Sequence, residues 1–161
     1  MLDYLDPDCR LTLREAIRQL REEDAKERDV APVVAPEVER SMTAHDAVHV
    51  IFACDTSDRG EAVAHAWMLL GTDVTHREIA SVTGTRDHQT FARELGHGRR
   101  VRAALSALPA IAAAFWRARR MRARWSWTGY DRWLDTPLHE IRREYGVRVP
   151  KRREAVWRVP A

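Results

Sequence analysis

Residues 36–70 read PEVERSMTAHDAVHVIFACDTSDRGEAVAHAWMLL. This stretch predicts a helix from about Pro36 to Ala53, a polar turn over residues 55–60 and a second helix over residues 61–70, which Gly71 would end as the residue just beyond it. The short turn is expected to make the two helices an antiparallel pair. Candidate core residues of the first helix are Val38, Met42, Val48, Ile51 and Phe52.

The segment before this pair also predicts a helix, over residues 11–28. Leu13, Ile17 and Leu20 follow one another at helical spacing, with charged residues between them. Thr12 and Glu15 have the spacing of a capping box. Two prolines within residues 30–36 would break the helix and make a short linker inside one domain.

Beyond the pair, helical patterns continue to about residue 145. A flexible break is predicted at residues 96–98, a kink or boundary at Pro109 and a helix end at Gly146, before an irregular basic tail from about residue 147. Alternation typical of strands is scarce, so the predicted fold is all-α, a single domain over residues 1–161 with six to seven helices. The further helices are predicted over residues 75–82, 86–96, 101–124 and 130–145.

Composition limits the class of protein. With 161 residues and 45% apolar content, the chain can bury one core. No stretch approaches the roughly 20 apolar residues that cross a bilayer. The acidic start, MLDYLD, is typical of neither a signal peptide nor a transit peptide. Cys9 and Cys54 are expected to be reduced, buried thiols, which favours a cytoplasmic location.

Charge is distributed unevenly along the chain. Residues 1–98 carry 11 Lys and Arg and 19 Asp and Glu, whereas residues 99–161 carry 16 and 5. The second half is expected to attract an anionic partner such as nucleic acid, a lipid headgroup or a phosphorylated ligand. Alternatively, the two halves face each other within the fold. Their opposite charges are also compatible with a homo-oligomer.

Candidate metal ligands lie in residues 45–61, HDAVHVIFACDTSDRGE. His45 and His49 are four residues apart, so on a helix both imidazoles project from one face and can bind one ion. Asp46 lies about 100° around the helix from His45, where it could bind directly or orient a histidine. Glu61 starts the next helix, and the turn would bring its carboxylate back towards the histidines.

Two imidazoles with one or two carboxylates suit Zn²⁺ with an open coordination position, or Fe²⁺ or Mn²⁺. Structural explanations remain open: the histidines could be surface or core residues, Asp46 a solvated charge, and Glu61 part of a capping box that starts at Asp58. A zinc protease is not expected, because HDxxH has aspartate where HExxH has its general base.

The pattern from His45 through Asp46 and His49 to Glu61, HDxxH followed by eleven residues and E, resembles the signature of the ubiquinone (coenzyme Q) biosynthesis family known as Coq-four. The run HDAVHVIF, the GEA step around Glu61, Trp67, and a closing segment within residues 125–150 are similar to the same family. The resemblance is good over residues 36–75. The chain departs from the family in its shorter length, in Ala53 where glycine is frequent, and in residues 76–100, which do not align.

The resemblance implies an all-helical fold and a zinc site formed by His45, Asp46, His49 and Glu61. It implies a metal-dependent lyase that removes the C1 carboxyl group, in some accounts oxidatively, from a polyprenylated hydroxybenzoate. Zinc would stabilise the developing charge, and Asp46 could carry a proton to the ring carbon. It also implies peripheral membrane contact and a complex with other ubiquinone-biosynthesis proteins.

An apolar groove for the prenyl tail would need a wall, and Val101–Trp116 is the candidate. With the arginines that follow, this helix could lie on the inner face of a membrane, or it could be a core helix with a solvated basic end. Several tryptophans could mark an interface or belong to the core. The arginines are Arg117, Arg119, Arg120, Arg122 and Arg124, and the tryptophans are Trp116, Trp125, Trp127 and Trp133.

Three rival functions come from other classes. The first is a scaffold or lipid-binding component of a ubiquinone-biosynthesis complex, with a structural metal. The second is a nucleic-acid-binding module, which the absence of a helix-turn-helix signature and the wide spread of the arginines disfavour. The third is a hydrolase of the HD type, for which His76, His88 and His97 do not supply the required pattern.

Overall fold

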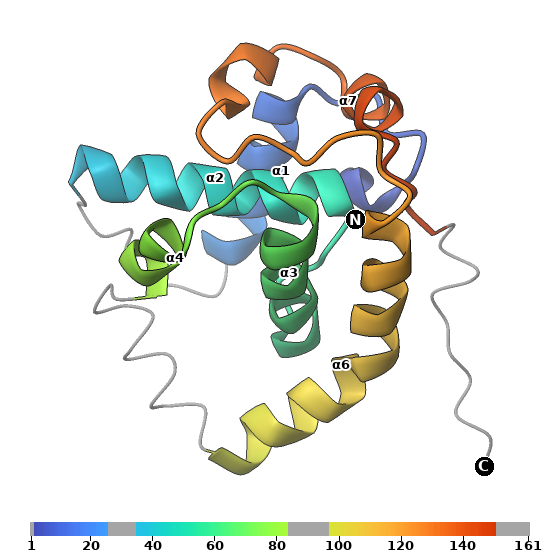
Figure 1. Cartoon of the computed structure of the whole chain (residues 1–161). Helices are drawn as coiled ribbons and strands as arrows, with labels where there is room; N and C mark the ends of the chain where they lie inside the picture. The colour runs from blue at the N-terminus through green and yellow to red at the C-terminus, as the bar shows by residue number, and fades with distance from the viewer. Residues whose placement is uncertain (1, 26–34, 84–96, 151–161) are drawn as a thin grey trace.

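The computed structural model describes residues 2–25, 35–83 and 97–150. Within these ranges the chain forms six α-helices, two short 3-10 helices and no strand, so the predicted all-α class is confirmed (Figure 1). In chain order the elements are η1 (Asp3–Leu5), α1 (Leu13–Ala25), α2 (Pro36–Phe52), α3 (Asp58–Gly71), α4 (His76–Thr83), α6 (His97–Ala118), η2 (Tyr130–Trp133) and α7 (Leu138–Tyr145).

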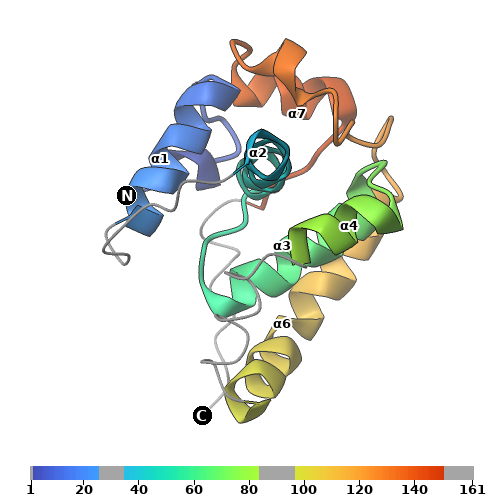
Figure 2. The same cartoon turned by 90° about the vertical axis from the view of Figure 1, so that its left-hand side faces the viewer.

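Helix α2 lies at the centre of the fold. Its C-terminal half is buried from Ala44 to Phe52, except for the half-buried Asp46. Figure 2 looks along its axis and shows α1 and α7 on one side of it and α3, α4 and α6 on the other. Because His45 and His49 belong to this buried half, the packing of the core fixes their positions.

Helix α1 follows its sequence pattern. Leu13, Ile17 and Leu20 are all buried, as their spacing predicts. The capping box is confirmed: Thr12 donates its backbone N–H to the Glu15 carboxylate at 2.8 Å, and the Glu15 N–H donates to Thr12 Oγ1 at 3.3 Å. This reciprocal pair satisfies two backbone donors that the first turn would otherwise expose.

Helix α3 differs from its prediction at both ends. It begins directly after Ser57, whose Oγ accepts the N–H of Gly60 at 3.1 Å. Gly71 is its last residue rather than the residue beyond it, so the predicted role of Gly71 is wrong. A Cβ at Gly71 would lie 2.8 Å from Trp67 and 2.9 Å from Phe52, so close packing of α3 on α2 explains this glycine.

Helix α6 begins earlier than predicted. His97 and Gly98 form its first turn, so the expected break is wrong at these two residues. Pro109 lies inside the helix, and Figure 1 shows the axis changing direction about halfway along, as expected where proline removes a hydrogen bond. The helix predicted over residues 86–96 lies outside the described residues.

The last predicted helix is interrupted. Residues 130–145 form η2 and then α7, because the chain turns where the Thr136 N–H donates to the Trp133 carbonyl and Pro137 precedes α7. The predicted helix end at Gly146 is confirmed, with φ at 69° in the left-handed region.

A buried arginine joins α7 to the end of α2. Arg142 is 3% exposed, and its guanidinium donates to the carbonyls of Val50 at 2.8 Å and Ile51 at 3.0 Å. It also donates to the carbonyls of Tyr4 and Asp6. Burial lowers the pKa of Arg142 to about 10, so the group stays charged at neutral pH. A cation is therefore held against the negative end of α2.

Candidate metal centre

Two histidines of α2 form one side of the candidate centre. His45 and His49 lie one turn apart and are 9% and 1% exposed, and their ring centroids are 4.8 Å apart. The structure therefore places both imidazoles on one face, as their spacing predicts. Helix α3 crosses α2 steeply in Figures 1 and 2 instead of running alongside it, and this crossing brings Glu61 to the histidines.

Glu61 comes from the first turn of α3. Its Oε1 lies 3.3 Å from His49 Nε2 and its Oε2 lies 3.9 Å from His45 Nε2. One ligand atom from each of the three residues lies within 4.8 Å of the other two. The capping-box explanation for Glu61 is not borne out, because Ser57 caps α3 and the Glu61 side chain faces the histidines.

The turn before α3 fixes the approach of Glu61. A Cβ on Gly60 would lie 2.1 Å from the Asp55 carbonyl oxygen, so only glycine allows this close contact. Asp55 Oδ1 in turn accepts the Ser57 backbone N–H at 3.1 Å. Gly60 therefore packs directly on Asp55. Because Glu61 is the next residue, this contact fixes where the Glu61 side chain starts.

The end of α2 orients His49. Ala53 has φ at 55° and ψ at 50°, and this left-handed residue turns the chain so that the Cys54 carbonyl faces the imidazole. His49 Nδ1 donates to that carbonyl at 3.3 Å, which leaves Nε2 with its lone pair towards Glu61. Tyr4 Oη donates to the same carbonyl at 3.3 Å.

His49 Nε2 is the most informative atom of the centre. It is buried, and within the described ranges it makes no hydrogen bond of acceptable geometry, although Glu61 Oε1 lies only 3.3 Å away. Burying a ring nitrogen without a hydrogen-bond partner costs free energy. A cation bound by both the nitrogen and the carboxylate would remove that cost. The donor set thus fits a cation.

The charges of the pair agree with this geometry. Burial would raise the pKa of Glu61, but the His49 ring 3.3 Å away and its charge outweigh it and lower that pKa to about 2. Burial would lower the pKa of His49, but Glu61 outweighs it and raises that pKa. Glu61 is therefore a carboxylate at neutral pH, as a metal ligand must be.

Asp46 does not join this cluster. Its Oδ2 accepts the Nε–H of Arg21 at 2.7 Å, and Arg21 also donates to Glu39 Oε1 and Thr43 Oγ1, each at 2.8 Å. Burial raises the pKa of Asp46 to about 6 even though Arg21 opposes the shift. The assignment of Asp46 as a ligand or proton carrier stays a prediction.

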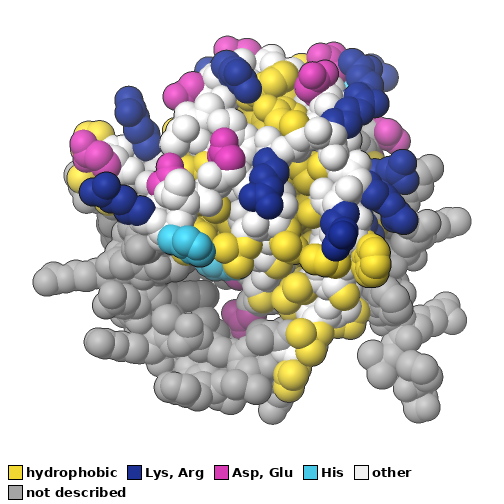
Figure 3. Space-filling view, viewed as in Figure 1, with side chains coloured by type: hydrophobic (Ala, Val, Ile, Leu, Met, Phe, Trp, Pro, Cys, Tyr) yellow, Lys and Arg dark blue, Asp and Glu magenta, His cyan; other side chains and the backbone are white. Residues whose placement is uncertain are grey.

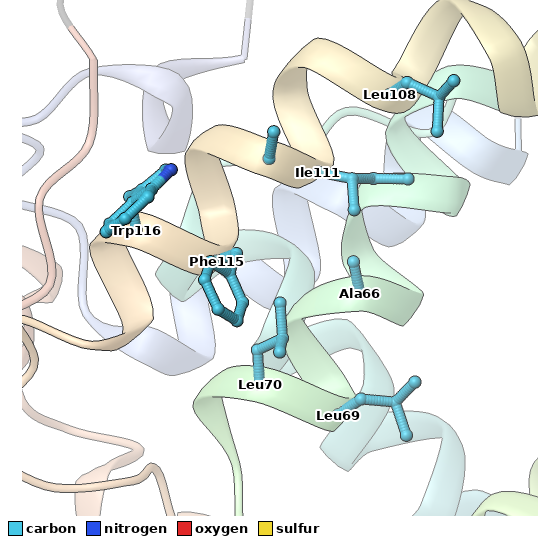
Figure 4. Close-up of a pocket in the computed structure, with 8 residues that line it drawn as sticks. Ala66, Leu69, Leu70, Leu108, Ile111, Phe115 and Trp116 are labelled. Atoms are coloured by element: carbon cyan, nitrogen blue, oxygen red, sulfur yellow. The ribbon is translucent and has the colours of Figure 1, made fainter.

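An apolar groove of about 450 Å³ lies between α3 and α6. Figure 4 shows Leu69 and Leu70 of α3 opposite Ile111 and Phe115 of α6, and Figure 3 shows hydrophobic side chains reaching the surface in this lower part of the molecule. Helix α6 was the predicted wall of such a groove. The remaining lining residues are Ala66, Leu108, Ala112 and Trp116.

The other aromatic and cysteine candidates divide between core and surface. Trp125 and Trp127 are buried, whereas Trp116, which lines the groove, is 60% exposed. Cys9 and Cys54 are free and buried, as predicted.

Among the helices that the structure describes, none is long and apolar enough to cross a bilayer.

In comparisons of this chain with protein-family models, curated proteins and solved structures, no family, protein or structure matches. The geometry of the site therefore carries the functional argument.

Sequence reasoning missed Arg21 as the partner of Asp46, since no local spacing connects α1 to α2. It also missed His65, although its position four residues after Glu61 places both on one face of α3.

Proposed function

We propose that this protein binds one divalent metal ion through His45, His49 and Glu61 and acts on an anionic aromatic compound with a long apolar tail. The observation that carries the proposal is the buried His49 Nε2, 3.3 Å from Glu61 and without a well-aligned hydrogen bond in the described chain. Zn²⁺ is the proposed ion, with Fe²⁺ or Mn²⁺ as alternatives for the same ligands.

The proposed reaction is removal of the C1 carboxyl group from a polyprenylated hydroxybenzoate, which the resemblance to the Coq-four family suggests. Two neutral imidazoles and one carboxylate leave a bound divalent ion with net positive charge, which favours an anionic ligand. An ion held there would act as a Lewis acid on a substrate oxygen.

The groove between α3 and α6 is the proposed binding site for the apolar tail of the substrate. Leu69 lies eight residues after Glu61, about 12 Å along the axis of α3, and the groove residues Ala66, Leu69 and Leu70 lie about 80–180° around this axis from Glu61. A compound with its charged ring at the ligands would therefore run its prenyl chain around α3 to reach the groove against α6. The groove walls would exclude water from the chain.

A second candidate function is a lipid-binding component, with a structural metal, that assembles with other ubiquinone-biosynthesis proteins. The same groove favours it, because binding a prenyl chain requires no reaction. The exposed apolar residues Leu105 and Trp116, at 61% and 60% exposure, are also available for contact with a partner or a membrane surface.

The test compares two matched leucines of α6. Leu108 lines the groove and is 55% exposed, whereas Leu105 is 61% exposed and is not part of the lining. We expect Leu108→Glu to weaken binding of a prenylated hydroxybenzoate about tenfold or more, because the charge must be desolvated against the chain. Leu105→Glu is expected to bind like the wild type.

Release of CO₂ from the same compound by metal-loaded protein separates the two functions. Turnover that both metal removal and Leu108→Glu reduce would support the decarboxylase. Binding without turnover would support the lipid-binding component. Equal binding by both leucine variants would show that the groove is not the binding site.

A further inference from the structure

His65 lies beside the candidate metal centre and belongs to none of the roles described above. It is half-buried and follows Glu61 by one turn of α3. Its ring centroid is 5.6 Å from that of His45, with 55° between the ring planes. A third imidazole therefore borders the centre from the same helix that supplies the carboxylate.

The spacing of the rings suits one shared ion. With metal–nitrogen distances of about 2.0–2.1 Å, two imidazoles on one ion have centroids about 4.5 Å apart at a right angle and about 6.4 Å apart when opposite. The observed separations, 4.8 Å for His45 and His49 and 5.6 Å for His45 and His65, both fall in this range.

The hydrogen bond of His65 has the same form as that of His49. His65 Nδ1 donates to the Glu61 backbone carbonyl at 2.8 Å, as His49 Nδ1 donates to that of Cys54. Such a bond fixes the tautomer in which Nε2 carries a lone pair, and this arrangement is usual for histidines that bind metals. Two helices thus present histidines prepared in the same way.

We propose that His65 is a fourth protein ligand of the metal centre, an inference that rests on the metal binding proposed above. The cluster within 4.8 Å comprises His45, His49 and Glu61, so binding of the ion by His65 would require its ring to move inward from the observed position. Three imidazoles and one carboxylate would close a tetrahedral zinc site. They leave two positions open in a six-coordinate ion such as Fe²⁺ or Mn²⁺.

This ligand set makes the choice of ion functionally decisive. With four protein ligands, zinc would be structural and would favour the lipid-binding function. A six-coordinate ion would keep room for the carboxylate and the neighbouring oxygen of an aromatic acid. The inference therefore links the identity of the ion to the choice between the two proposed functions.

The experiment titrates Co²⁺ into the full-length wild type, His65→Ala and His76→Ala, and follows the visible absorption of the ion. His76 is an exposed histidine of α4 and serves as the control. We expect His65→Ala to lower the affinity about tenfold or more and to shift the spectrum, because one nitrogen is replaced by solvent. His76→Ala should leave both unchanged.

A second measurement needs no substitution. In the Co²⁺-loaded wild type, the ring N–H protons of bound histidines give strongly shifted NMR signals, and three ligands predict three such signals. Two signals, or wild-type affinity and spectrum in His65→Ala, would overturn the assignment of His65 while leaving the proposed function intact. No Co²⁺ binding by the wild type would overturn the proposed function and this inference with it.

Discussion

Single residues set the geometry of the candidate centre. The backbone of Ala53 turns the Cys54 carbonyl onto the imidazole of His49, and Gly60 lets the first turn of α3 approach Asp55. Neither residue carries a functional group, yet each determines where a possible ligand points. The left-handed conformation of Ala53 costs free energy that a glycine at this position would not.

At this scale we predict that Ala53→Gly stabilises the protein by about 0.5–1 kcal/mol, because relief of the left-handed strain exceeds the added entropy of the unfolded chain. Urea unfolding of the metal-free protein measures the change. Ala112→Gly, at an exposed position inside α6, is the control and should destabilise by about 1 kcal/mol. Equal losses in both variants would contradict the strain.

At the scale of elements, α2 depends on its neighbours. Arg142 of α7 donates to the carbonyls of Val50 and Ile51, which the last turn of a helix cannot satisfy by itself. The same guanidinium fastens the N-terminal segment through the Tyr4 and Asp6 carbonyls. One buried cation therefore connects three separate parts of the chain.

We predict that Arg142→Met destabilises the protein by about 2–4 kcal/mol, because several buried carbonyls lose their donor. Arg143→Met, on the exposed face of the same helix, should change stability by no more than about 0.5 kcal/mol. Urea unfolding of both variants provides the comparison. Similar small losses for the two would show that Arg142 is not a structural link.

Elements were also the scale at which the sequence was most informative. Apolar spacing located α1 and α2 closely, because both helices bury one continuous face or segment in the core. It placed Gly71 just beyond the end of its helix, since a sequence pattern cannot reveal that Trp67 and Phe52 pack against that residue.

The candidate site was predictable where the ligands are local. His45 and His49 share one helix turn, so their spacing alone places them together. The pairing of Asp46 with Arg21 depends on how α1 and α2 pack, and such contacts leave no periodic signal in the sequence. For the same reason the sequence left open whether Asp46 binds the ion directly or orients a histidine. His65 did leave a signal, because it follows Glu61 by four residues on one face of α3.

For the whole molecule, the pair His49 and Glu61 should make stability depend on pH. The pKa of Glu61 falls from its ordinary 4.5 to about 2, so its contribution is present above pH 4.5 and lost as pH falls towards 2. The pKa of His49 is raised from its ordinary 6.5, so its contribution is present below 6.5 and lost as pH rises through the raised value.

The stability difference between the metal-free wild type and Glu61→Gln should therefore be largest between about pH 4.5 and 6.5, where both contributions of the pair are present. Urea unfolding of both proteins from pH 3 to 8 measures this difference. Added metal should reverse the trend and stabilise increasingly as pH rises, because histidines bind metal when neutral. A stability difference between the two proteins that does not change with pH would contradict the ion pair.

The central claim concerns the three-residue metal centre, and the most direct measurement is the metal content of the purified full-length protein by elemental mass spectrometry. The comparison is a His45→Ala/His49→Ala double variant, with His76→Ala as the control. We predict about one zinc, iron or manganese ion per chain in the wild type and in the control, and none in the double variant. A wild type that holds no metal and takes up none on titration would contradict the account.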